Sequence, residues 1–245
     1  MSSQSPPTGP TPARRAPVAG VDGCRSGWVV ATWTDGSRDA ALQLEVCGHF
    51  EEVVHRVARG DLALVAVDMP IGLADRGPRQ CDRAARRLLG PRRSSVFSTP
   101  VRPVLACETY PEALEISRKA SGVGLSKQAW FLVPKLREVD AVMRRVRLTD
   151  AVLEVSPELS FAALAGAPLV HPKRSAEGLR TRRDLLRPLF PQLDDLLSRR
   201  YPGAAPDDLL DACALAWSAH RLQRGNGCRV GDEVDGTGLP MTVSW

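Results

Sequence analysis

Residues 18–33, "VAGVDGCRSGWVVATW", contain two short apolar runs separated by a turn, and a single carboxylate closes the first run. This pattern predicts one strand at about 17–22, ending at Asp22, and a second at 27–34. A carboxylate at the end of a buried strand is either a turn residue or a metal ligand. The positions of the other acidic residues in the chain distinguish these two roles for Asp22.

The segments that follow extend this pattern. A third strand is expected at 40–47, and short polar turns join it to the first two in an antiparallel meander. Residues 49–60 have apolar side chains at helical intervals and end at a glycine, which predicts a helix. The run "DLALVAVDMP", residues 61–70, is typical of a strand covered on both faces, and it also ends in a carboxylate, Asp68.

Three more acids occur in the second half of the chain. "AVLEV" at 151–155 predicts another strand and carries Glu154. An alanine-rich helix is expected at 205–222, where Asp208 and Asp211 are three residues apart and face the same way. Helix capping explains Asp208. Asp211 lies one turn further among apolar residues, where a carboxylate is costly unless it is paired or bound to a cation.

We expect these acids to meet at one edge of the sheet, with catalytic roles for Asp22, Asp68, Glu154, Asp208 and Asp211. Carboxylates so close together raise one another's pKa values unless a hard divalent cation neutralises them, and oxygen ligands suit Mg²⁺ or Mn²⁺. Two such ions about 3.5–4 Å apart activate a water and stabilise the leaving oxygen of a phosphodiester. The expected metal ligands are Asp22, Asp68, Asp208 and Asp211.

Between the strands at 61–70 and 151–155 the pattern is helical, which predicts an insertion at about 70–149. Helices are expected there and beyond it, at 79–89, 109–120, 126–146, from 157 onward and over 175–199.

Arginine is concentrated in two stretches of the chain. Residues 79–102 hold seven arginines against one aspartate, and a second basic stretch spans 171–187. Arginine forks match phosphate oxygens and suit a nucleic-acid backbone, although a solvated helix face has the same composition. The candidate substrate-binding residues are Arg25 after the first strand and, within the insertion, Arg92, Arg93, Ser94, Ser95, Lys127 and Gln128.

The composition predicts one soluble domain, because 245 residues with 43% apolar content can bury a single core. We expect this domain to span 17–245, after a flexible Pro/Ser/Thr-rich tail at 1–16. No secretion signal and no membrane-spanning apolar window occur, and the six cysteines lack zinc spacing. These features predict a cytoplasmic protein with reduced thiols. The net charge of +5 favours an anionic partner such as nucleic acid.

Several motifs follow one another in a fixed order: "GVDGCRSGWVVA", "VDMPIGL", "CDRAARRLLGPRRSSVF", "GLSKQAW", "EVSPELSFAAL" and "DDLLDACALAW". Together they resemble a bacterial and archaeal family of unknown function that is described as predicted ribonuclease H-like nucleases. The resemblance implies an α/β fold with three antiparallel strands, then parallel strands, flanking helices and a helical insertion.

For the site, the resemblance implies that Asp22 is the central metal ligand and that Asp68 takes the second strand position. Asp208 and Asp211 would supply the helix carboxylates. Glu154 matches the family's "E-V-x-P-E" motif but no agreed position of the wider superfamily. Resolvases of this fold act as symmetric dimers, which leaves a homodimer open, although the chain shows no dimerisation motif.

Two other functions are left open by the sequence. A nucleic-acid-binding or scaffolding protein would use the same basic residues, with its acids binding metal for stability alone. An ATP-dependent phosphotransferase of related fold would begin with a similar strand but needs a second Gly-rich phosphate loop. The candidate for that loop, "DEVDGTG" at 232–238, lacks an apolar strand before it and a helix after it.

Overall fold

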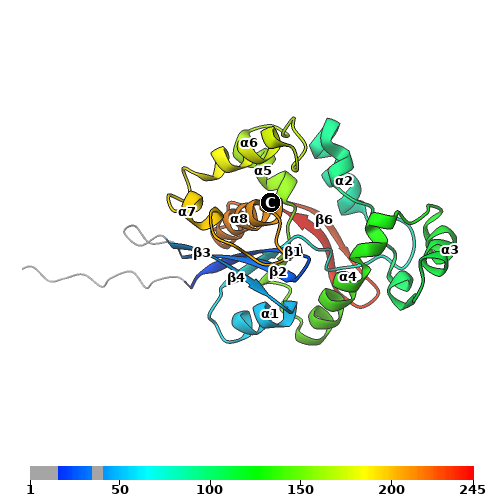
Figure 1. The fold of residues 1–245 in the computed structure, drawn as a ribbon. Coiled ribbons are helices and arrows are strands. Elements are labelled where there is room, and N and C mark those ends of the chain that lie inside the picture. Colours follow the sequence, from blue (N-terminus) through cyan, green and yellow to red (C-terminus); the bar gives the residue numbers. More distant parts are fainter. Residues whose placement is uncertain (1–15, 35–40) are drawn as a thin grey trace, which may run out of the picture.

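A five-stranded mixed sheet forms the centre of the protein in this computed structural model, which describes residues 16–34 and 41–245 (Figure 1). The spatial order is β3-β2-β1-β4-β5. Its strands are β1 (Val18–Cys24), β2 (Gly27–Thr34), β3 (Ala41–Cys47), β4 (Leu64–Val67) and β5 (Val152–Glu154). The first three strands pair antiparallel, whereas β4 and β5 run parallel to β1. This arrangement confirms the mixed ribonuclease H-like sheet that the sequence predicts.

The strands follow the apolar runs, with two differences from the expected bounds. β1 continues two residues beyond Asp22 because it pairs with β2 down to the tight turn before Gly27. β4 covers only four residues of the run at 61–70. The chain is still turning after the preceding helix at 59–61, and Pro70 has no amide hydrogen for a sheet ladder.

Helices cover both faces of the sheet, so the central strands are buried on both sides (Figure 1). On one face lie α5 (Pro157–Ala165), α6 (Ala176–Leu186), α7 (Leu193–Leu197) and α8 (Pro206–Gln223). On the other face lie α1 (Phe50–Ala58) and α4 (Lys127–Val146). The expected helical region at 175–199 is divided into α6 and α7, because Pro188 and Pro191 interrupt the amide ladder between them.

The chain between β4 and β5, predicted from the sequence as an insertion at about 70–149, is mainly helical. It contains α2 (Gln80–Leu89), the 3₁₀ helices η1 (Gly90–Ser95) and η2 (Arg102–Ala106), α3 (Tyr110–Ser121) and α4. A small apolar cluster of its own joins α3, η2 and the first half of α4. All but the last residue of the expected tail at 1–16 lies outside the described residues.

A C-terminal hairpin, β6 (Arg229–Val234) with β7 (Pro240–Ser244), was not predicted, because the sequence of β6 has no apolar run. Its turn includes the Gly-rich segment proposed as a phosphate loop. There the carboxylate of Asp235 accepts hydrogen bonds from the amides of Leu73, Thr237 and Leu239. A buried carboxylate therefore takes the amides that a phosphate loop would offer its ligand, which argues against the phosphotransferase.

The six cysteines of the protein are free thiols, five of them buried and Cys228 exposed. Among the described residues, no helix has the length and apolar character needed to cross a membrane.

Candidate active site

Asp22 and Asp68 stand at the same end of two neighbouring parallel strands. Val21 pairs with Val67 in the sheet, and the amide of Asp68 donates to the carbonyl oxygen of Val21 at 2.9 Å. Asp22 is buried, and its Oδ1 accepts a hydrogen bond from the amide of Gly23 at 2.8 Å. The parallel register thus brings together the two acids that close the two apolar runs.

Asp211 reaches the same place from α8, which packs closely against β1. A Cβ atom at Gly20 would overlap the carbonyl oxygen of Ala212 and the amide of Ala216, so only glycine permits this approach. Asp211 is 1% exposed. Its Oδ2 accepts a hydrogen bond from Lys173 Nζ at 2.6 Å, whereas its Oδ1 is buried with no hydrogen-bond partner among the described residues.

The three carboxylates influence one another electrostatically. Burial, and then the negative charges of Asp68 and Asp211, hold the pKa of Asp22 well above its ordinary value. Burial raises the pKa of Asp68 to about 7, with the positive charge of Lys173 opposing the rise. Burial also raises the pKa of Asp211, again against Lys173. Each of these acids is therefore costly to ionise unless further positive charge reaches the site.

Lys173 is the cation that folds into this cluster. It lies in the loop between α5 and α6 and contacts Asp211 at 2.6 Å and Asp207 Oδ2 at 3.7 Å. Burial disfavours its charge, but Asp211, Asp22 and Asp68 together raise the pKa of Lys173 above its ordinary value. The sequence placed Lys173 only within a basic stretch. A signal was present, because the chain has four lysines among 33 basic residues.

Asp208 and Glu154 make other contacts. Asp208 Oδ2 accepts a hydrogen bond from the amide of Ala205 at 2.9 Å and so caps α8. Both oxygens of Glu154 accept from Arg79, at 2.6 and 2.8 Å, and Oε2 also accepts from the amide of Ile71. The same guanidinium binds Asp82. These contacts favour structural roles for Asp208 and Glu154, and their predicted catalytic roles stay predictions.

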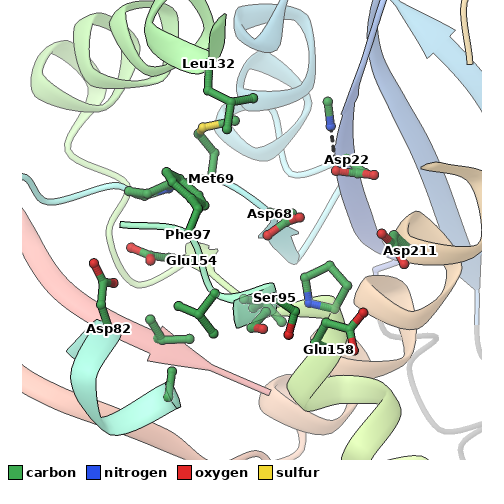
Figure 2. A pocket seen from close by; sticks show the side chains of 18 of the residues that line it. Asp22, Asp68, Met69, Asp82, Ser95, Phe97, Leu132, Glu154, Glu158 and Asp211 are labelled. Carbon is green, nitrogen blue, oxygen red and sulfur yellow. Dashed lines mark hydrogen bonds between the residues drawn. The ribbon is translucent and has the colours of Figure 1, made fainter. Parts of the chain in front are cut away.

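Glu158 is an acid of this region for which the sequence indicates only a helix-capping role. It stands in the first turn of α5, and its Oε1 accepts from buried Arg182 at 2.6 Å. Its Oε2 is buried and has no hydrogen-bond partner among the described residues. Figure 2 shows Glu158 and Asp211 on the same side of the pocket, with Asp68 nearer its centre and Glu154 and Asp82 on the far side.

These acids line a pocket of about 510 Å³ that also opens onto the insertion (Figure 2). Four of the predicted substrate-binding residues contribute to its wall: Arg92, Ser94, Ser95 and Gln128. Arg92 Nε is buried with no hydrogen-bond partner among the described residues. The remaining three, Arg25, Arg93 and Lys127, are exposed and do not line this pocket.

The donor chemistry of the pocket fits a divalent cation. Its acids offer carboxylate oxygens, which Mg²⁺ and Mn²⁺ prefer, and Asp211 Oδ1 is a buried oxygen without a partner among the described residues. Across residues 16–34 and 41–245, no three acidic, histidine or cysteine side chains surround a single point. A cation would therefore be held after the carboxylates turn toward it.

The fold and this pocket define a ribonuclease H-like α/β domain with an acidic centre at the ends of β1 and β4. The chain belongs to the family described as "Protein of unknown function (DUF429)", whose model matches residues 20–235. No curated protein matches it. Among solved structures it is similar to "T. thermophilus RuvC in complex with Holliday junction substrate", with 12% identity and a TM-score of 0.41. That match covers 86% of this chain and 97% of the other.

Proposed function

We propose that this protein is a divalent-cation-dependent nuclease that hydrolyses phosphodiester bonds in the pocket between the sheet and the insertion. The observation that carries the proposal is the meeting of Asp22, Asp68 and Asp211 in one pocket, with a buried oxygen of Asp211 left without a partner among the described residues. Such a cluster is unfavourable on its own and becomes favourable when it binds a cation.

Asp22, Asp68 and Asp211 are the residues that would hold Mg²⁺ or Mn²⁺. When bound, such a cation lowers the pKa of a water ligand and offsets negative charge on a leaving oxygen. The positions of the three acids on β1, after β4 and in α8 give them a rigid support, because all three elements belong to the buried core.

The part of the pocket lined by the insertion supports a phosphate-bearing substrate. Arg92, Ser94 and Ser95 of the 3₁₀ helix η1 line the same pocket as the carboxylates, and Arg92 Nε has no hydrogen-bond partner among the described residues. A guanidinium binds phosphate oxygens through paired hydrogen bonds. These residues would bind the phosphate of a phosphodiester beside the carboxylates.

A cleavage assay tests the proposal. Labelled single-stranded, duplex, hybrid and four-way-junction substrates are incubated with Mg²⁺ or Mn²⁺ and the wild-type protein, Asp22→Asn or Asp211→Asn. Asp61→Asn is the matched control, because Asp61 is exposed and pairs only with Arg59 in the described structure. We expect cleavage by the wild type and by Asp61→Asn, and loss of cleavage in the other two variants.

The other outcomes separate the alternatives. If the wild type and Asp22→Asn bind nucleic acid equally well and neither cleaves it, the protein is a nucleic-acid-binding protein and not a nuclease. Cleavage that survives in both Asp22→Asn and Asp211→Asn would place the chemistry elsewhere on the molecule. The same panel identifies whether the substrate is DNA or RNA and whether it is branched.

A further inference from the structure

One positive charge is already built into the carboxylate cluster. Lys173 Nζ lies 2.6 Å from Asp211 Oδ2, and its charge interacts with those of Asp22 and Asp68. A second basic residue of the pocket wall, Arg174, is 78% exposed, and its Nε donates to Asp207 at 3.0 Å. Lys173 therefore takes a position among the acids that a metal ion would otherwise take.

The loop that carries Lys173 is held in place from both sides. Ser175 caps α6 by accepting a hydrogen bond from the amide of Gly178, and the amide of Ser175 donates to the carbonyl oxygen of Pro172. A Cβ atom at Gly178 would overlap that same oxygen of Pro172. On the other side, buried Arg182 donates to the carbonyl oxygen of His171. Lys173 thus enters the cluster from a packed turn.

The charge of the cluster favours one divalent cation. Asp22, Asp68, Asp208 and Asp211 line the pocket and carry four negative charges when ionised, which two divalent ions would balance. Lys173 already offsets one of these charges. A second ion beside Lys173 would therefore leave the buried site with a net positive charge, which is unfavourable in a region of low dielectric constant.

We propose that this site takes a single divalent cation and that the ammonium group of Lys173 stands in the place of a second one. The proposal rests on the proposed function and narrows the two-ion site expected from the sequence. In hydrolysis, the ammonium group would provide positive charge beside the reacting phosphate without a second metal.

The test is the number of Mn²⁺ ions bound per chain, measured by the electron paramagnetic resonance signal of free Mn²⁺ during titration. We expect one ion for the wild type and two for Lys173→Met. Lys173→Arg keeps the positive charge and should bind one. Arg174→Met is the matched control, because it removes a neighbouring, mostly exposed charge that pairs with Asp207 rather than with Asp211, and it should also bind one.

Circular dichroism of each variant establishes that it is folded before titration. Two ions in the wild type, or one ion in folded Lys173→Met, would overturn the inference while leaving a metal-dependent nuclease in place. If Lys173→Met does not fold, the wild type and Lys173→Arg still test the single-cation proposal. Two ions bound to either protein would contradict it. A wild type that binds no Mn²⁺ would overturn the proposed function together with this inference.

Discussion

The guanidinium of Arg79 donates to both carboxylate oxygens of Glu154, at 2.6 and 2.8 Å, and both side chains are buried. Arg79 stands at the start of α2 in the insertion, whereas Glu154 ends β5 of the sheet. This ion pair therefore connects α2 of the insertion to β5 at the edge of the acidic pocket.

Removing one partner of this pair should destabilise the protein rather than remove its chemistry. We expect Arg79→Met to lower the free energy of unfolding by about 3–5 kcal/mol, because it leaves buried Glu154 and Asp82 without their counter-charge. Urea unfolding measures this. The exposed Arg59→Met, which loses only a surface pair with Asp61, should change it by less than about 1 kcal/mol. A stability loss no larger than that of the control would contradict the structural role.

Asp68 should make the stability of the metal-free protein depend on pH. Its pKa is raised to about 7 by burial, so the native state keeps a proton that the unfolded chain releases near its ordinary value of 3.8. Between these two pH values the native state binds more protons than the unfolded state, and the free energy of unfolding falls as pH rises through about 7. Asp68→Asn removes this pH-dependent loss of stability.

The expected gain of Asp68→Asn over the wild type is up to about 4 kcal/mol at pH 8 and less than about 2 kcal/mol at pH 5. Urea unfolding in the presence of a chelator at the two pH values measures it. An equal gain at both pH values would show that Asp68 ionises normally in the folded protein.

Arg92 and Arg93 offer a matched pair for testing substrate binding. Both lie in η1, but only Arg92 lines the pocket. We expect Arg92→Met to weaken nucleic-acid binding roughly tenfold, or about 1.4 kcal/mol, and to reduce the salt dependence by about one phosphate contact. Arg93→Met should have a smaller effect. Fluorescence anisotropy at several salt concentrations compares them, and equal effects would point to a diffuse basic surface instead.

Gly20 controls the distance between α8 and β1. Gly20→Ala should destabilise the protein by about 1–3 kcal/mol, because the new methyl group overlaps the backbone of Ala212 and Ala216. The helix must move away and take Asp211 with it, so Mn²⁺ affinity should fall as well. Gly48→Ala is the control, since its Cβ would meet only Glu52 Oε1 at 3.6 Å. Unchanged Mn²⁺ affinity in folded Gly20→Ala would show that Asp211 is not a ligand.

The local pattern of the chain was sufficient to predict the sheet. Apolar runs at 18–33 and 61–70 specify strands, and Asp22 and Asp68 close those runs wherever the strands lie in space. Because parallel neighbouring strands end at one edge, their convergence could be predicted as well. The polar strand β6 carries no such pattern, so the C-terminal hairpin could not be predicted.

The sequence by itself determined that five acids stand at the ends of strands or near the start of a helix: Asp22, Asp68, Glu154, Asp208 and Asp211. Only the tertiary structure decided which of them has a fixed partner. Arg79 binds Glu154 across 75 residues of sequence, and Lys173 binds Asp211 across 38. The physical reason is that the chemical state of a buried carboxylate depends on the cation that folding places beside it, and such contacts between distant segments leave no periodic pattern in the sequence.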